Sequence, residues 1–410
     1  MAVDTVAAAE DAVETASQAI AQVSARVVSR AYRTPFAISS GATPRLESVL
    51  VSVRTQDAAG TGETTAMTAY SGETTAGVID VIESVLTPAV LGHPLFDLAG
   101  LHKRMDEAVR GRSLAKAAID MAAIDAQGRM LGVAAGALLG GRVRDAIDTA
   151  WVIGLGEIEA TVAEAAAKAG EGYRHIKVKG GLDPRRDAEL VEELCRALPA
   201  GVELAIDFNE AYDLGTALPT LQRMQRAGLA LAEQPVPGWD AEGLARLTAA
   251  LDLRVMADES VQSIHDAMRL AHMNACDVFN IKLLKVGGLY RARQVAAIAE
   301  AAGIAVKVGS MPELGLATMA AAHFAAATPV ASVPADLIGP LLVDDDIIDP
   351  APFLARPGQV ILPDGPGLGV DVGPPGIAPG SPAGPGSPAG PGSPAVPGSP
   401  AGPGAGTVTQ

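Results

Sequence analysis

From residue 141 onward, short apolar segments alternate with longer amphipathic segments along the chain. Each apolar segment ends at or beside one of residues 179, 207, 233, 258, 282 and 309, which are 24 to 28 residues apart. Because a strand, a helix and their two connections fill that spacing, each step predicts one βα unit. The predicted strands are His175–Lys179, Leu204–Asp207, Leu231–Glu233, Val255–Asp258, Phe279–Lys282 and Ala305–Val308.

Two more strands, near Trp151 and near Val330, bring the count to eight. Eight parallel strands close a barrel, so we predict an α/β fold with a (β/α)8-type barrel, a modified TIM barrel, over residues 141–373, including a C-terminal return to the preceding domain. An open, doubly wound sheet is the alternative. It is disfavoured because no Gly-x-Gly-x-x-Gly follows a first strand, so the dinucleotide fingerprint is missing.

The N-terminal third follows a different pattern. β-branched residues alternate with others over 20–34 and 49–55, on either side of a Ser-Ser-Gly turn at 39–41, and predict two strands. Residues 77–140 are typical of helices, the longest over 114–131. Strands followed by helices predict a separate α+β domain over residues 19–140, with residues 1–18 as an N-terminal extension.

The C-terminal segment, residues 374–410, contains no charged residue. It repeats Gly-Ser-Pro-Ala-Gly-Pro with a period of six residues from Gly380. Such a segment buries too little apolar surface to offset the entropy lost on ordering it. We therefore predict a disordered Gly/Ser/Pro/Ala tail.

Composition excludes several classes of protein. With 49% hydrophobic residues among 410, the chain has ample material for a core, and its net charge of −16 repels phosphate backbones. The N-terminus lacks the cationic region of a secretory signal, and two cysteines make no disulfide framework, so we expect a cytoplasmic protein. The uncharged stretch Leu314–Ala335 contains two prolines and predicts a buried helix followed by a strand rather than a membrane span.

Candidate chemistry gathers at the predicted strand ends, where (β/α)8 barrels carry their active sites. Asp207, Glu233 and Asp258 end three successive strands. Three carboxylates cannot share a pocket at neutral pH without a cation, and an all-oxygen ligand set favours Mg²⁺ or Mn²⁺. Each acid taken singly fits a helix cap equally well, but three in register favour the metal site.

Basic residues flank these acids. Lys177 and Lys179 are two apart on one strand, so their side chains leave on the same face. We expect their mutual repulsion and a nearby metal to lower a lysine pKa, which makes a neutral amine available as a general base. Lys282 approaches from the other side of the barrel, whereas Lys285 is expected to leave the barrel.

In combination, these motifs resemble those of the enolase superfamily and, within it, the muconate lactonizing enzyme subgroup, over residues 33–372. The segments around 33–41, 62–63 and 70–74 resemble the capping domain with its specificity loops. The resemblance implies that Lys179 carries the proton at the carbon next to a carboxylate, that Lys177 tunes it and that Lys282 opposes it. The matching motifs are Lys177-Val-Lys179, Asp207-Phe-Asn209, Glu233-Gln-Pro235, Asp258-Glu-Ser260 and Asn280-Ile-Lys282.

The same resemblance assigns metal ligation to the three acids, and it implies that Asn209, Glu313 and Tyr70 bind substrate or support the site. No His follows the seventh strand, which disfavours mandelate racemase-like enzymes and acid-sugar dehydratases. The segment after the eighth strand, Ala335-Asp336-Leu-Ile338, lacks the second acid of the Asp-x-Asp found in dipeptide epimerases. The segments 309–313 and 336–342 instead resemble those of muconate cycloisomerases.

The expected activity is therefore a divalent-metal-dependent cycloisomerase acting on a dicarboxylate of the cis,cis-muconate type through an enolate. The alternatives are a racemase or epimerase of N-acyl amino acids or dipeptides, an o-succinylbenzoate synthase and, more remotely, a non-catalytic binding protein. We expect a small carboxylate substrate, a homo-oligomer, and no nucleic-acid or membrane partner.

Overall fold

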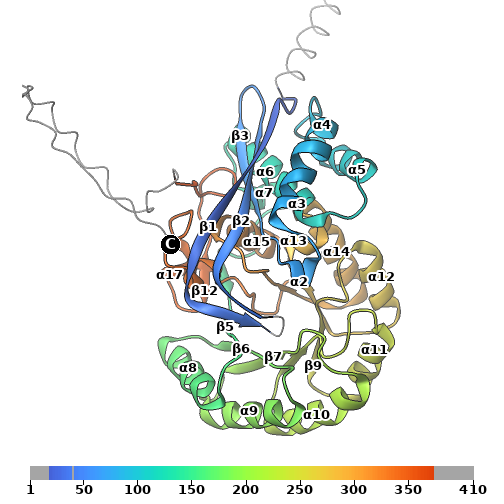
Figure 1. The fold of residues 1–410 in the computed structure, drawn as a ribbon, viewed down its shortest axis with the longest axis vertical. Coiled ribbons are helices and arrows are strands. Elements are labelled where there is room, and N and C mark those ends of the chain that lie inside the picture. Colours follow the sequence, from blue (N-terminus) through green and yellow to red (C-terminus); the bar gives the residue numbers. More distant parts are fainter. Residues whose placement is uncertain (1–17, 39–40, 374–410) are drawn as a thin grey trace, which may run out of the picture. The chain divides into compact units, whose positions relative to one another are not determined.

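A computed structural model of the chain describes residues 18–38 and 41–373 (Figure 1). The predicted extension up to residue 17, the turn residues 39 and 40, and the predicted tail over 374–410 lie outside the described residues.

Three antiparallel strands form the sheet of the N-terminal region, in the order β1 (Gln22–Ile38), β2 (Gly41–Arg54) and β3 (Ala59–Thr64). The sequence predicted the first two strands and missed β3, because glycines at alternate positions weaken its strand propensity. A Cβ atom at Gly60 or Gly62 would lie 2.2 or 2.0 Å from a backbone oxygen of the neighbouring helix. The glycines therefore let the strand approach that helix closely.

That helix is α6 (Ser113–Leu131), the longest of the N-terminal region and the one predicted over 114–131. Its residues 114–128 are all buried, as expected for a helix that is largely apolar on every side. The other N-terminal helices are α2 (Thr68–Ser71), α3 (Thr75–Asp80), η1 (Val81–Leu86), α4 (Thr87–Val90), α5 (Leu98–Ala108) and α7 (Ala135–Leu138).

Seven parallel strands form the barrel wall in sequence order, and helices α8–α12 lie along its outside (Figure 1). The strands are β5 (Trp151–Ile153), β6 (His175–Lys179), β7 (Glu203–Asp207), β8 (Leu231–Glu233), β9 (Arg254–Ala257), β10 (Val278–Ile281) and β11 (Ala305–Val308). The helices are α8 (Ile158–Glu171), α9 (Pro184–Ala197), α10 (Leu214–Ala227), α11 (Ala241–Ala250), α12 (Ile264–His272), α13 (Leu283–Val286), α14 (Leu289–Ala302) and α15 (Gly315–Ala326).

Two isolated bridges from the segment 333–335, rather than an eighth strand, link β11 to the residues just before β5. Val333 makes a parallel bridge to Lys307, and Ala335 makes one to Thr149. The eighth strand predicted near Val330 is thus reduced to these two bridges, which lie a few residues further on. Beyond it follow α16 (Gly339–Leu342), α17 (Ala351–Leu354) and β12 (Gln359–Ile361), which pairs antiparallel with β4 (Ala146–Asp148).

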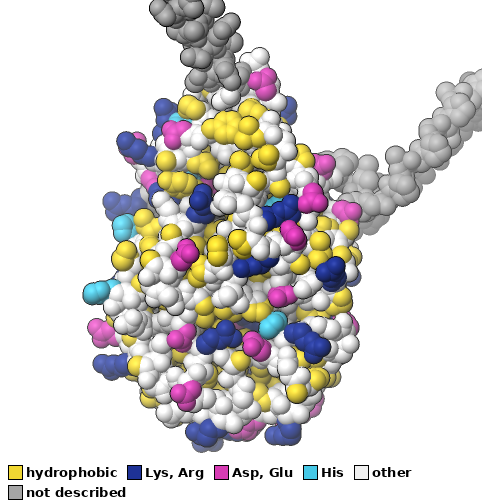
Figure 2. All heavy atoms as spheres, turned by 180° about the vertical axis from the view of Figure 1, so that it is seen from behind, with side chains coloured by type: hydrophobic (Ala, Val, Ile, Leu, Met, Phe, Trp, Pro, Cys, Tyr) yellow, Lys and Arg dark blue, Asp and Glu magenta, His cyan; other side chains and the backbone are white. Residues whose placement is uncertain are grey.

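Helix α15 occupies the uncharged segment that the sequence assigned to a buried helix, and every one of its residues is buried. Among the described residues, no helix is both long and apolar enough to cross a membrane. On the molecular face shown in Figure 2, basic and acidic side chains are interspersed, so that face offers no continuous basic surface to a phosphate backbone.

The N-terminal region and the barrel are joined at the first turn of α15. The Glu63 carboxylate on β3 accepts hydrogen bonds from the backbone amides of Leu314 (2.7 Å) and Ala317 (2.9 Å). Asp346 accepts one from the amide of Gly315 (3.0 Å). These acids satisfy amides that have no partner within the helix, and Glu63 thereby fixes the position of β3 against the barrel.

His323, in the last turn of α15, makes stability depend on pH. Its Nδ1 accepts from the Gly136 amide (3.3 Å) and its Nε2 lies 3.1 Å from the Leu368 carbonyl oxygen, so the ring is neutral. Burial lowers the pKa of His323 from 6.5 to about 4. An unfolded chain therefore takes up a proton below pH ~6.5 that the folded chain refuses until pH ~4, and stability falls as the pH falls through this window.

We expect the free energy of unfolding to fall by about 2 kcal/mol because of His323 when the pH is lowered from about 7.5 to about 5. Urea denaturation of the wild type and of His323→Gln at both pH values measures it. The wild type should lose about 2 kcal/mol more than the variant over this range. Equal losses would show that His323 is not held neutral.

Candidate active site

Three carboxylates meet at the C-terminal ends of neighbouring strands. Asp207 and Glu233 end β7 and β8 and are paired in register, and Asp258 follows the last residue of β9. All three are fully buried, and one carboxylate oxygen from each lies within 4.8 Å of the others. The structure therefore brings together the three residues that the sequence predicted as metal ligands.

The charges of this triad fit a divalent cation. Burial and the negative charge of Asp207 raise the pKa of Glu233 to about 7, although Lys177 opposes the shift. Burial also opposes ionisation of Asp207 and Asp258, but nearby lysines hold both pKa values well below the ordinary value. Three converging carboxylates that repel one another are the oxygen ligand set that Mg²⁺ or Mn²⁺ prefers.

A neighbouring amide orients one of these ligands. Asn280 on β10 donates from Nδ2 to Glu233 Oε1 at 2.9 Å. This contact leaves Glu233 Oε2 directed at the Lys177 ammonium, 2.6 Å away. Such outer contacts fix the orientation of metal-binding carboxylates.

Lys177 lies among acids. Its Nζ is 3.0 Å from Asp207 Oδ2, 2.6 Å from Glu233 Oε2 and 2.9 Å from Asp336 Oδ2. Burial lowers the pKa of Lys177, but these three carboxylates raise it by more, so the net pKa is well above the ordinary lysine value. The acids facing Lys177 therefore outweigh the repulsion of its one like-charged neighbour, Lys179.

Lys179 and Asn209 form the next part of the site. Lys179 Nζ lies 2.6 Å from Asp207 Oδ2 and donates to Asn209 Oδ1 at 2.8 Å. Asn209 has a φ of 43°, a left-handed conformation that asparagine tolerates, and its Nδ2 donates to Glu259 Oε1 at 2.9 Å. Asn209 therefore fixes the Lys179 ammonium beside the triad.

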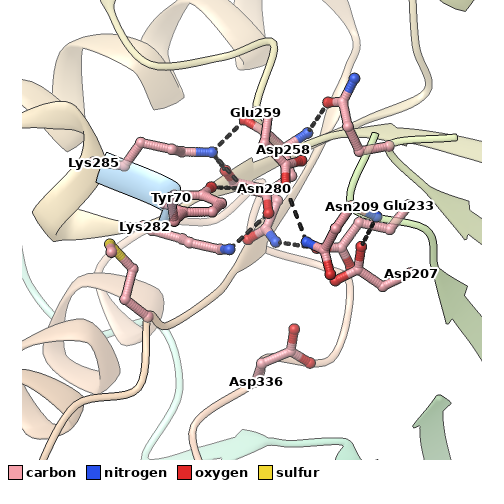
Figure 3. A network of polar contacts seen from close by, with 12 residues as sticks. Tyr70, Asp207, Asn209, Glu233, Asp258, Glu259, Asn280, Lys282, Lys285 and Asp336 are labelled. Atoms are coloured by element: carbon pink, nitrogen blue, oxygen red, sulfur yellow. Dashed lines mark hydrogen bonds and ion pairs between the residues drawn. The ribbon is translucent and has the colours of Figure 1, made fainter. Parts of the chain in front are cut away.

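Lys282 and Lys285 both bind Asp258 (Figure 3). Lys282 Nζ lies 2.6 Å from Asp258 Oδ2, and Lys285 Nζ lies 2.5 Å from Oδ1. The expectation that Lys285 leaves the barrel is wrong. The chain enters the one-turn helix α13 directly after Lys282, and a helix returns residue i+3 to the same face. That three-residue spacing is the signal that the sequence analysis missed.

Tyr70 reaches the site from helix α2 of the N-terminal region. Its hydroxyl donates to Asp258 Oδ1 at 3.4 Å, and Lys282 Nζ lies 5.0 Å from its ring centre (Figure 3). Glu313 is placed differently. It is buried behind the cavity wall, where it accepts from the Met311 amide at 3.0 Å, and burial together with Glu63 raises its pKa well above the ordinary value.

Tyr70, Lys177, Lys179, Asn209 and Lys282 line one open cavity. Lys179 on the second barrel strand and Lys282 after the sixth face it from different strands of the ring. The rest of its wall is mostly apolar, so a ligand would contact few polar groups besides the lysines, Asn209 and Asp336. Its lining residues are Met67, Tyr70, Val152, Lys177, Lys179, Asn209, Lys282, Ser310, Met311, Pro312, Asp336, Ile338, Gly339 and Leu342.

Both parts of the chain match known families. Residues 20–140 match the mandelate racemase/muconate lactonizing enzyme N-terminal domain, and residues 160–375 match the enolase C-terminal domain-like family. Muconate cycloisomerase 1 of Rhodococcus opacus is 38% identical over 306 residues, which cover 74% of this chain and 82% of that protein.

Other relatives carry a different activity in their names. The L-Ala-D/L-Glu epimerase of Clostridium acetobutylicum is 32% identical over 343 residues, covering 83% of this chain and 95% of that protein.

The structure of muconate lactonizing enzyme from Pseudomonas fluorescens, complexed with muconolactone, superposes with a TM-score of 0.84 at 32% identity and covers 87% of this chain and 97% of that one. The chain therefore belongs to the mandelate racemase/muconate lactonizing enzyme family of the enolase superfamily, as an isomerase of its muconate lactonizing enzyme subgroup.

Proposed function

We propose that the protein is a divalent-metal-dependent cycloisomerase that closes a dicarboxylate of the cis,cis-muconate type to a lactone. The observation that carries this proposal is the buried triad of Asp207, Glu233 and Asp258 with Lys179 and Lys282 facing the same cavity. The similarity to muconate cycloisomerase 1 of Rhodococcus opacus supports the choice of substrate class.

A divalent ion held by the triad would supply positive charge beside a substrate carboxylate and so lower the cost of negative charge developing there. The carbon–oxygen bond of the lactone forms when the other carboxylate attacks the double bond, and the π electron pair moves to the carbon next to the first carboxylate. The Lys179 ammonium gives its proton to that carbon. Its contacts with Asp207 and Asn209 hold Nζ in place for this transfer.

The neutral Lys179 amine left by this step recovers its proton from solvent. Lys282 would act as a fixed cation, because its Nζ is held at 2.6 Å from Asp258 and lies beside the Tyr70 ring. Lys177 contacts two triad acids and would hold them in position. In this assignment one lysine moves the proton and the other two supply charge.

Racemisation or epimerisation is the second candidate, favoured by the similarity to the L-Ala-D/L-Glu epimerase of Clostridium acetobutylicum. That reaction would use Lys179 and Lys282 as acid and base in turn. The same triad would serve it, so the two candidates differ in whether Lys282 moves a proton as well as Lys179.

The direct test is loss of the ultraviolet absorption of cis,cis-muconate when it is incubated with protein and Mg²⁺ or Mn²⁺. We expect loss that stops when EDTA removes the metal, and an unchanged rate for Lys103→Ala, whose side chain is 75% exposed on α5. Constant muconate absorption, together with α-proton exchange of a dipeptide or an N-acyl amino acid, would refute the cycloisomerase and favour the racemase or epimerase.

A further inference from the structure

A lysine occupies the interior of the barrel outside the set of residues assigned above. Lys307 lies on β11, two residues after Ala305, so both side chains are on the same face of the strand. Ala305 packs against the interior cluster formed by Leu231, Met256, Val278 and Val333. Barrel interiors are mostly filled by branched apolar residues, yet Lys307 is there and only 2% exposed.

Lys307 is paired with the one carboxylate among the cavity-lining residues. Its Nζ lies 2.7 Å from Asp336 Oδ1, while Lys177 Nζ lies 2.9 Å from Oδ2. Both oxygens of Asp336 are therefore used by lysines. Because Lys177 also contacts Asp207 and Glu233, the three residues Lys177, Asp336 and Lys307 form a buried chain from the barrel interior to the triad.

This pairing decides what charge a ligand meets. The cavity is lined by the ammonium groups of Lys177, Lys179 and Lys282, and Asp336 is the partner that a ligand ammonium would need. With Lys307 in place, Asp336 is neutralised from behind the cavity wall. Without it, Asp336 would depend on Lys177 alone, which is shared with two triad acids, and would keep negative charge to offer to a ligand.

We propose that Lys307 is a positioning residue that sets substrate class: by pairing with Asp336 it reserves the cavity for dicarboxylates and excludes ligands that carry a free ammonium group. This inference rests on the proposed function, because it concerns the substrate of that same site. Lys307 acts through Asp336 and does not line the cavity itself.

The test compares two ligands that differ by one ammonium group. Adipate and 2-aminoadipate are titrated calorimetrically into the Mg²⁺-loaded protein. We expect the wild type to prefer adipate by about tenfold or more, and Lys307→Met, whose unbranched side chain fills similar space, to lose at least about tenfold of that preference. Lys307→Arg, which keeps the charge, should retain the preference.

Two further variants separate this role from a structural one. Lys307→Met combined with Asp336→Asn leaves no unpaired buried charge and no acid for an ammonium, so it should fold and should keep the preference for adipate. Lys116→Met removes another buried lysine, 2.7 Å from Asp106 and away from the cavity, and should leave the preference unchanged. A general loss of stability would weaken both ligands alike.

The inference is overturned if the wild type shows no preference for adipate, if Lys307→Met keeps the wild-type preference, or if the double variant prefers 2-aminoadipate. Muconate turnover is measured separately on the same proteins. If the wild type leaves muconate unchanged but Lys307→Met shifts the ligand preference, the proposed function is refuted and the role of Lys307 is supported. If the wild type turns over muconate but Lys307→Met does not shift the preference, the proposed function is supported and the role of Lys307 is refuted.

Discussion

Replacing Glu233 by glutamine is expected to abolish turnover and weaken Mg²⁺ binding by about tenfold or more, while the fold is preserved. The substitution keeps the size of the side chain and one oxygen ligand, but it removes one of three ligand charges. Glu233 is fully buried and oriented by Asn280 at 2.9 Å, so no other residue can take its place without moving the strand.

Titration calorimetry with Mg²⁺ and the muconate absorption assay measure the two effects, and circular dichroism checks the fold. Glu242→Gln is the matched control, because Glu242 is an exposed glutamate on α11, and it should bind Mg²⁺ and turn over muconate like the wild type. Full activity of Glu233→Gln at ordinary Mg²⁺ concentrations would place the metal site elsewhere.

The barrel could be predicted from sequence because its strands are short apolar segments at regular spacing. His175–Lys179, Leu231–Glu233 and Ala305–Val308 were predicted with the bounds that the structure has. Strand β3 could not be predicted in the same way. Gly60 and Gly62 allow β3 to contact the backbone of α6, and residues of β3 and α6 are far apart in sequence.

The candidate site was predictable where residues end strands and unpredictable where contacts cross the barrel. The triad follows from three acids at three strand ends. The role of Lys285 depends on the helical turn after Lys282, and the pairing of Asp336 with Lys307 joins β11 to the segment that closes the ring. The high pKa of Lys177 has the same origin, because two of its partners come from other strands and the third from the closing segment.

The last prediction distinguishes cycloisomerisation from racemisation by the proton-transfer roles of Lys179 and Lys282. Lys179 ends the second of the seven barrel strands and Lys282 directly follows the sixth, so the two lysines face the cavity from opposite sides of the barrel. A cycloisomerase needs one proton carrier, and a racemase needs an acid and a base. In a cycloisomerase, proton exchange should therefore be lost in Lys179→Ala but not in Lys282→Ala. In a racemase, each variant should exchange the proton of one enantiomer, opposite for the two variants.

For a cycloisomerase, Lys179→Ala should lose about 10³-fold or more in turnover and should incorporate no solvent deuterium into the lactone. Lys282→Ala should lose turnover by electrostatics but retain slow exchange catalysed by Lys179. Arginine keeps the charge and does not give up its proton, so Lys282→Arg should recover part of the rate and Lys179→Arg none. Proton NMR in deuterated water follows both reactions. If each alanine variant instead exchanges the α-proton of only one enantiomer of an N-acyl amino acid, opposite for the two variants, both lysines move protons and the protein is a racemase.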